Sequence, residues 1–358
     1  MNKLEFFKDK QILITGHTGF KGSWLCEILL ALGANVIGYS LETNTSPNLF
    51  SILELDKRTN NYISDIRDYK TLLEIMKKEK PEIVIHMAAQ PLVRESYNEP
   101  IYTYETNVIG TVNVLQAIKE TNCVRSAVMI TTDKVYENKE RNEPYTEDDE
   151  LGGYDPYSTS KACAELIIRS YTRSFFNPNQ YQDSHNTLVA SARAGNVIGG
   201  GDWSKDRLVP DIVKAVFENN EKVIVRNPDS IRPWQYVLEP SYGYMLLAKK
   251  LYEGKKEFSG AWNFGPNNEN YLTVKELLEK ALKILKKGSY TIKKDYTKHE
   301  SKLLRLDISK AKNVLGWRPS FDIDTTLNLT FDWYKSFYSK EDIVNLANQQ
   351  IESFFNRV

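Results

Sequence analysis

Short apolar runs alternate with helix-like segments through the first half of the chain. The apolar runs cover residues 11–16, 35–40, 82–89 and 126–133. Apolar residues recur at helical spacing in residues 23–33, 69–81 and 106–122. Continuous apolar strands between amphipathic helices indicate a parallel sheet that is covered on both faces. We therefore expect an α/β fold with a doubly wound, Rossmann-type sheet, which binds ligands at the carboxyl ends of its strands.

The second half of the chain has a less regular pattern. Residues 186–203 begin as a strand and continue into a glycine-rich loop. Residues 208–219 and 273–288 have the spacing of helices, and a helix-like tail follows from about residue 339. We expect a second, smaller mixed α/β domain here, which interleaves with the first along the chain.

Composition excludes several classes of function. The chain has 358 residues, with 47 Lys and Arg against 47 Asp and Glu. Zero net charge argues against a nucleic-acid surface built from bulk charge, and no stretch is apolar for long enough to span a bilayer. Cys26, Cys123 and Cys163 form neither a disulfide framework nor a zinc spacing. We expect a cytoplasmic protein with no metal and with no nucleic-acid or membrane partner.

The segment GHTGFKG joins the first predicted strand to the first predicted helix. Its glycines, Gly16, Gly19 and Gly22, are spaced as GxxGxxG. Glycines at such a turn let the backbone approach a pyrophosphate closely, and the helix N-terminus faces the phosphates with unpaired N–H groups. The loop therefore predicts dinucleotide binding.

Two acidic residues bear on the choice between NAD and NADP. An acid at the end of the second strand would favour NAD, because it can bind the ribose hydroxyls. Glu42 lies shortly after that position in the sequence. Asp65 could face the adenine, and it is equally suited to cap a loop or a helix. These positions leave the choice of cofactor open.

Tyr157 and Lys161 are four residues apart in YDPYSTSKACAE, residues 154–165. On a helix this spacing places both side chains on one face. Most such pairs are structural, but this one opens a helix after a proline and follows a strand that ends in TTD. A nearby ammonium and a positive nicotinamide ring would lower the pKa of the phenol from its usual value of about 10. The phenolate could then take the proton of a sugar hydroxyl.

Together these motifs resemble the extended short-chain dehydrogenase/reductase family, whose catalytic set is a tyrosine, a lysine and a Ser/Thr. Thr132 matches the Ser/Thr position. The blocks TTDKVYEN, LGGYDPYSTSKACAE, RAGNVIGGGDW and IRPWQYVLEP are similar to the nucleotide-sugar 4,6-dehydratases that act on CDP-glucose. The resemblance runs from residue 11 to about 320. The branch that acts on dTDP-glucose has Asp–Glu where this chain has Asp133–Lys134.

The resemblance implies an internal redox reaction on a nucleotide sugar with NAD, and hence a lyase of deoxysugar and cell-surface polysaccharide synthesis. C4 is oxidised, water is lost across C5 and C6, and the hydride returns to C6. Tyr157 would be the base at O4, Lys161 its electrostatic support and a ribose ligand, and Thr132 a hydrogen-bond partner of O4. Asp133 would protonate the departing C6 hydroxyl. Two roles stay open for Lys134: it removes the C5 proton, or it only pairs with Asp133 or binds the substrate.

The resemblance also implies binding residues and an assembly. The cofactor would contact Gly16, Thr18, Gly19, Phe20, Gly22, Asp65, Ile66, Ala88, Ala89, Tyr157 and Lys161. The nucleotide sugar would contact Gln90, Asn196, Arg207 and Arg232, although either arginine could instead form a structural ion pair. Residues 1–190, with part of 232–262, would form the NAD-binding domain, and residues 191–358 the substrate domain. A homodimer or higher homo-oligomer would form through helices at 106–122 and 158–175.

Two competing interpretations remain. The first is another nucleotide-sugar enzyme, either a 4-epimerase or a dehydratase for a different nucleotide. An epimerase needs no acid directly after the Ser/Thr, so Asp133 argues against it. The second is a non-catalytic dinucleotide-binding sensor, which would have no need of Thr132, Tyr157 and Lys161.

Overall fold

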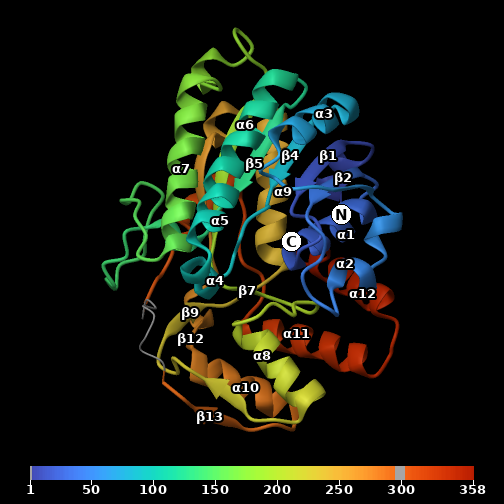
Figure 1. The fold of residues 1–358 in the computed structure, drawn as a ribbon, viewed down its shortest axis with the longest axis vertical. Coiled ribbons are helices and arrows are strands. Elements are labelled where there is room, and N and C mark those ends of the chain that lie inside the picture. The colour runs from blue at the N-terminus through green and yellow to red at the C-terminus, as the bar shows by residue number, and fades with distance from the viewer. Residues whose placement is uncertain (1, 295–302) are drawn as a thin grey trace.

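The computed structural model describes residues 2–294 and 303–358, and a parallel sheet forms its centre (Figure 1). Seven strands pair in parallel in the order β11-β6-β5-β4-β1-β2-β3. Their bounds are β1 Gln11–Thr15, β2 Asn35–Ser40, β3 Asn60–Ile63, β4 Ile83–His86, β5 Ser126–Ile130, β6 Leu188–Ala194 and β11 Gly260–Phe264. The strand order reverses at β1, from which β2 and β3 extend to one side and β4 to β11 to the other. The predicted doubly wound sheet is confirmed.

Helices cover both faces of this sheet. One face carries α1 (Phe20–Ala31) and α9 (Leu238–Tyr252), and the other carries α3 (Tyr69–Glu79), α6 (Gly110–Thr121) and α7 (Pro156–Ser174) (Figure 1). The side chains of β1 alternate between the two layers. Ile12 and Ile14 join the apolar cluster that contains Trp24 of α1, whereas Leu13 joins the cluster that contains Leu72 of α3. Because both faces are buried, the three central residues of the strand are all apolar.

A second group of elements lies in the lower half of Figure 1. Three short strand pairs belong to it: β7 (Val197–Ile198) with β10 (Gln235–Tyr236), β9 (Ile231–Pro233) with β12 (Tyr271–Thr273), and β8 (Val223–Val225) with β13 (Tyr290–Ile292). The later helices are α8 (Leu208–Val213), α10 (Val274–Leu285), α11 (Ile323–Tyr338) and α12 (Ile343–Phe355). The first third of the chain also contains three short helices: α2 (Leu49–Ile52), α4 (Val93–Asn98) and α5 (Pro100–Tyr104).

The chain passes between the two groups more than once. β6 spans residue 190, where the sequence placed a boundary, and both α9 and β11 return to the sheet after β7 to β9. The division of the chain at residue 190 therefore stays a prediction. The segments that follow β1, β4, β5 and β6 all begin at the carboxyl-terminal edge of the sheet, because these four strands are parallel.

Candidate active site

The glycine loop after β1 fits a dinucleotide. Gly16 has a φ of +76°, and a Cβ atom there would lie 2.8 Å from the backbone nitrogen of Ala88, just beyond β4. A Cβ atom on Gly22 would lie 2.2 Å from the carbonyl oxygen of Gly16. No side chain caps α1 at Gly19, so the first N–H groups of this helix remain available to a phosphate. The loop thus combines tight backbone packing with an open helix N-terminus.

Replacing Gly22 by alanine is expected to weaken NAD binding at least about tenfold, because the new methyl group displaces the backbone that surrounds the phosphates. Calorimetric titration with NAD measures the change. Gly265→Ala is the matched control, since a Cβ atom at Gly265 would meet only side-chain atoms at 3.4 Å or more. Equal affinities in the two variants would contradict the assignment of the loop.

Other predicted cofactor residues lie around this loop. The hydroxyl of Thr18 lies 2.9 Å from that of Ser40 and donates to the carbonyl oxygen of Leu41 at 2.9 Å, which holds the loop against the end of β2. Asp65 forms an ion pair with Arg67 at 2.8 Å, and the hydrogen bonds from Arg67 lower the pKa of this carboxyl group. Because Asp65 already pairs with Arg67 two residues away, its role in the loop is favoured over a contact with the adenine. The adenine contact stays a prediction.

The remaining predicted cofactor residues occupy the neighbouring segments. Phe20 begins α1, Ile66 is buried beyond β3, and Ala88 and Ala89 follow β4. His86, at the end of β4, hydrogen-bonds Thr15 at 2.7 Å, and burial and the charge of Lys161 lower its pKa to about 3. His86 is therefore neutral, and hydrogen bonds to Thr15 and Thr111 hold its ring in place.

The start of α7 positions the tyrosine and the lysine. Asp155 caps the helix by accepting a hydrogen bond from the backbone of Ser158 at 2.9 Å, and Pro156 occupies its first position. Tyr157 and Lys161 consequently lie on adjacent turns, and both are buried. The Lys161 amine donates to the carbonyl oxygen of Ile130 at 3.2 Å, which fixes α7 against the end of β5.

Thr132 lies between the tyrosine and a buried acid. Its hydroxyl is hydrogen-bonded to the side chain of Tyr157 and lies 2.9 Å from the Oδ1 atom of Asp133, to which it can donate. Three predicted catalytic residues from two distant segments thus meet at the carboxyl end of β5. Lys134, next in sequence, is half-buried.

The pKa of Tyr157 depends on its burial and on the charges around its phenol. Burial raises the pKa of Tyr157 to about 12, although the Thr132 hydrogen bond and the charge of Arg207 oppose the rise. Burial also lowers the pKa of Lys161 to about 8, against the charge of Glu165. The predicted lowering of the Tyr157 pKa includes the positive charge of the nicotinamide ring, which belongs to the bound cofactor, and it stays a prediction. Ionisation of Tyr157 needs positive charge from a bound ligand.

Asp133 has the properties of a proton donor. Its side chain is 4% exposed, and burial raises the pKa of its carboxyl group, opposed by Lys134, the Thr132 hydrogen bond and Arg232. A raised pKa keeps a carboxylic acid protonated closer to neutral pH, as a general acid requires.

A buried ion pair stabilises the packing around Tyr157 and Thr132. Glu165 lies on α7 one turn after Lys161 and pairs with Arg193 of β6 at 2.8 Å. Glu165 also accepts hydrogen bonds from Thr131 at 2.6 Å and from Ser191 at 2.8 Å. Both carboxylate oxygens of Glu165 are thus hydrogen-bonded, whereas the buried Nε atom of Arg193 has no partner among the described residues. The pair joins α7, β5 and β6, so it fixes Tyr157 relative to Thr132.

The predicted substrate residues differ in their surroundings. Gln90 is buried, and its amide hydrogens donate to Leu92 and Thr103 at 3.1 and 2.9 Å. Its side-chain oxygen accepts from the backbone nitrogen of Leu92 at 2.6 Å, so only the second lone pair of this oxygen is left for a sugar hydroxyl. Asn196 follows β6 and is half-buried. A sugar contact of either residue stays a prediction.

Two arginines are close enough to the catalytic residues for their charges to act on them. The charge of Arg207 acts on Tyr157 and that of Arg232 on Asp133. Arg207 also pairs with Asp202 at 3.3 Å. Arg232 is 7% exposed and donates to the carbonyl oxygen of Ile231 at 2.9 Å. Their positions suit the binding of a diphosphate near the catalytic set.

Sequence reasoning did not identify Lys21 or Tyr244 as parts of this region. Lys21 lies in the first turn of α1, and burial together with the charges of Arg207 and Lys161 lowers its pKa to about 7, with Asp133 opposing. Its amine lies 5.8 Å from the ring centroid of Tyr244, on α9. The segment GHTGFKG contained Lys21, but a lysine at a helix start gives no sign of which way it points.

The model of the GDP-mannose 4,6 dehydratase family matches residues 13–330. The chain belongs to this family. The family predicted from the motifs, an extended short-chain dehydrogenase/reductase, is therefore confirmed. In the described residues no group of metal-ligating side chains is present, and no helix there is long and apolar enough to cross a membrane.

Relatives of several activities share this fold. A CDP-glucose 4,6-dehydratase of Salmonella typhimurium is 47% identical over 98% of each chain. A solved dTDP-glucose 4,6-dehydratase of Streptomyces venezuelae, with NAD bound, is 25% identical, with a TM-score of 0.79 over 93% of this chain and 99% of that one. A solved UDP-glucose 4-epimerase of Thermus thermophilus, in complex with NAD, is 23% identical, with a TM-score of 0.78 over 90% and 98% of the two chains.

Proposed function

We propose that the chain is an NAD-dependent CDP-glucose 4,6-dehydratase, a lyase that converts CDP-D-glucose to CDP-4-dehydro-6-deoxy-D-glucose. The observation that carries the reaction type is the buried acid Asp133, with a raised pKa, directly beside Thr132 and Tyr157. The preference for the cytidine nucleotide is supported by 47% identity to a CDP-glucose 4,6-dehydratase over 98% of both chains.

Each catalytic side chain has one task in this reaction. Tyr157 takes the proton from the C4 hydroxyl of the hexose, and Thr132 orients that oxygen through its own hydroxyl. Asp133 gives its proton to the C6 hydroxyl as it leaves. NAD⁺, when bound at the glycine loop, supplies an acceptor for the C4 hydride and a donor for its return to C6. Lys161 binds the ribose and holds α7 against β5.

Lys134 is assigned the removal of the C5 proton, and a proton must return to C5 when the hydride adds to C6. The motive is its place directly after the acid Asp133, where the dTDP-glucose branch has a glutamate, and its half-buried position beside the catalytic set. The alternative is that Lys134 only pairs with Asp133 or binds the substrate.

Replacing Lys134 by alanine is expected to slow solvent exchange at C5 by about 100-fold or more, the usual contribution of a general base. A single turnover in deuterated water, read by NMR of the sugar, measures this exchange. Lys139→Ala is the matched control, because Lys139 is exposed and pairs with Glu150. Exchange at the wild-type rate in Lys134→Ala would exclude the C5 role.

A direct assay tests the proposed reaction. The purified chain is incubated with NAD and, in turn, with CDP-glucose, dTDP-glucose and UDP-glucose. We expect a 4-keto product that is lighter than the substrate by one water molecule, formed fastest from CDP-glucose. A 4-epimerase would give a product of unchanged mass, and a non-catalytic sensor would bind NAD and turn over none of the three sugars.

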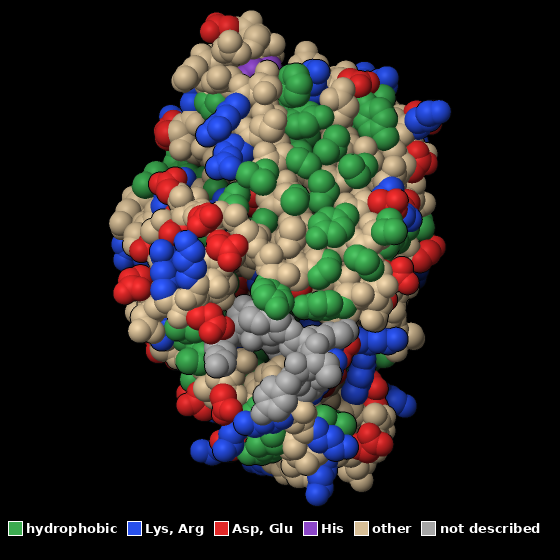
Figure 2. Space-filling view, turned by 60° about the vertical axis from the view of Figure 1, so that its left-hand side comes forward, with side chains coloured by type: hydrophobic (Ala, Val, Ile, Leu, Met, Phe, Trp, Pro, Cys, Tyr) green, Lys and Arg blue, Asp and Glu red, His purple; other side chains and the backbone are tan. Residues whose placement is uncertain are grey.

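The outer face of α5 and α7 supports a homo-oligomer. Exposed apolar side chains gather there: Ile101, Tyr104, Ile109, Leu166 and Phe175. They lie on α5, on the π-helical turn Glu105–Ile109, on α7 and, for Phe175, directly after the end of α7. These three elements contact one another. Figure 2 shows hydrophobic side chains spread over this side of the molecule. A patch of this kind usually marks a protein–protein contact, and a second copy of the chain is the partner that the helices at 106–122 and 158–175 predict.

Replacing Leu166, which is 45% exposed, by aspartate is expected to convert the oligomer to a monomer, because each copy would then bury a charge in the interface. Light scattering after gel filtration measures the molar mass. Ile224→Asp is the control, since Ile224 is 48% exposed on β8, away from this face. An unchanged mass for Leu166→Asp would place the interface elsewhere.

A further inference from the structure

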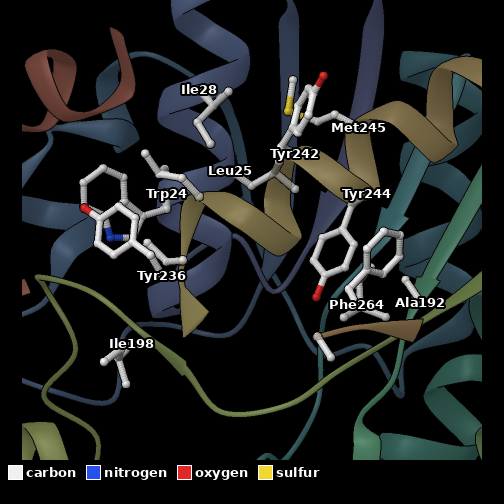
Figure 3. Close-up of a cluster of buried hydrophobic side chains, with 14 of the residues drawn as sticks. Trp24, Leu25, Ile28, Ala192, Ile198, Tyr236, Tyr242, Tyr244, Met245 and Phe264 are labelled. Carbon is white, nitrogen blue, oxygen red and sulfur yellow. The ribbon is translucent and has the colours of Figure 1, made fainter. Parts of the chain in front are cut away.

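The hydroxyl of Tyr244 is buried without a partner. Tyr244 lies in the second turn of α9 and is 0% exposed, and its ring packs edge-on against Phe264 at 5.7 Å between centroids. Its oxygen has no hydrogen-bond partner in the part of the chain that the structure describes. Figure 3 shows this oxygen pointing out of the apolar cluster, away from Tyr242 and Met245.

A buried hydroxyl without a hydrogen bond lowers the stability of the fold, and a hydrogen bond to a ligand would remove this cost. An unsatisfied polar group in a protein interior destabilises the fold, whereas phenylalanine would fill the same space at no such cost. Tyr236 is an informative contrast. It is equally buried, but its hydroxyl donates to Gln350 at 2.6 Å. A partner for Tyr244 must therefore come from outside the described chain.

The surroundings of Tyr244 indicate which ligand that partner belongs to. The Lys21 amine, from the first turn of α1, lies 5.8 Å from the ring centroid. Tyr157 is also close enough for its charge to act on the Tyr244 hydroxyl. Tyr244 thus lies near both the helix N-terminus that would hold the pyrophosphate and the tyrosine that would act at the reacting carbon. The nicotinamide riboside unit of the dinucleotide connects these two points.

We propose that the hydroxyl of Tyr244 forms a hydrogen bond to the carboxamide of bound nicotinamide and so fixes the orientation of that ring toward Tyr157. The inference rests on the NAD dependence of the proposed function. Burial and the neighbouring Tyr157 raise the pKa of Tyr244, so its hydroxyl keeps its proton and remains a donor. Tyr244 is on this view a cofactor-binding residue that lies far in sequence from the glycine loop.

Tyr244→Phe tests the contact with two ligands that differ only by the nicotinamide. Protein freed of bound dinucleotide is titrated calorimetrically with NAD⁺ and with ADP-ribose. We expect the variant to bind NAD⁺ about tenfold more weakly, as for loss of one buried hydrogen bond, and to bind ADP-ribose with unchanged affinity. Its melting temperature should equal or exceed that of the wild type, because an unpaired hydroxyl has been removed.

Tyr236→Phe is the matched control. It should lower the melting temperature, since it breaks the bond to Gln350, and leave the NAD⁺ affinity unchanged. Unchanged NAD⁺ affinity in Tyr244→Phe would overturn the proposal. Equal losses for NAD⁺ and ADP-ribose, or a fall in melting temperature like that of Tyr236→Phe, would also overturn it, because the hydroxyl would then be structural.

The proposed function can fail independently of this contact. If the wild-type chain forms no 4-keto product from any nucleotide glucose, the dehydratase assignment is wrong. A selective loss of NAD⁺ affinity in Tyr244→Phe would still support the nicotinamide contact in that case.

Discussion

Replacing Tyr157 by phenylalanine is expected to slow oxidation at C4 by about 10³-fold, within the range for loss of a general base. The ring would still fill its buried position, but no group would remain to take the proton of the C4 hydroxyl. The first turnover, followed by the rise of nicotinamide absorbance after mixing with CDP-glucose, measures this step. Binding of NAD should change little, because Lys161 and the glycine loop are intact.

Tyr154→Phe is the control for this experiment, since Tyr154 is three residues earlier and 74% exposed. It should oxidise C4 at the wild-type rate. If Tyr157→Phe also retained the wild-type rate, the phenol would have no part in proton transfer.

Asp133→Asn is expected to separate oxidation from dehydration. Asparagine preserves the shape and can still accept the hydrogen bond from Thr132, but it has no acidic proton for the departing C6 hydroxyl. Elimination should slow by about 100-fold or more, while C4 oxidation continues. Rapid quenching and mass spectrometry should then detect a 4-keto sugar that has kept all its oxygen atoms.

The pH dependence of the wild-type reaction follows from the same residue. Burial raises the pKa of Asp133, and the acid acts only while it is protonated. The rate of elimination should therefore fall as the pH rises through that pKa. This fall in rate should be absent from the pH profile of Asp133→Asn. An Asp133→Asn variant that eliminates water at the wild-type rate would contradict the role of the acid.

The sequence predicted the strands that are buried on both faces, since their apolar runs are continuous. It did not predict β3, an edge strand of sequence NNYI that is only half-buried. It also did not predict α9, which is buried almost all round and so lacks the alternation of polar and apolar faces that marks a helix. In the predicted helices at 106–122 and 208–219, the structure contains π-helical turns, Glu105–Ile109 and Lys214–Asn219.

The sequence could predict those parts of the candidate site whose residues lie within one short segment. The spacing of Tyr157 and Lys161 and the glycines of the loop are local features, and Asp133 is adjacent to Thr132. Tyr244 and Glu165 depend instead on contacts between distant segments, which no local pattern reveals. The rise of the Tyr157 pKa by burial in the chain alone could not be predicted, because the sequence does not reveal how deeply a side chain is buried.

The internal transfer of hydrogen from C4 to C6 is the central claim, and CDP-glucose labelled with deuterium at C4 tests it most directly. The account predicts a product that has lost one water molecule and carries the deuterium at C6, located by NMR. A product of unchanged mass, or a dehydrated product whose deuterium is lost to solvent, would contradict it.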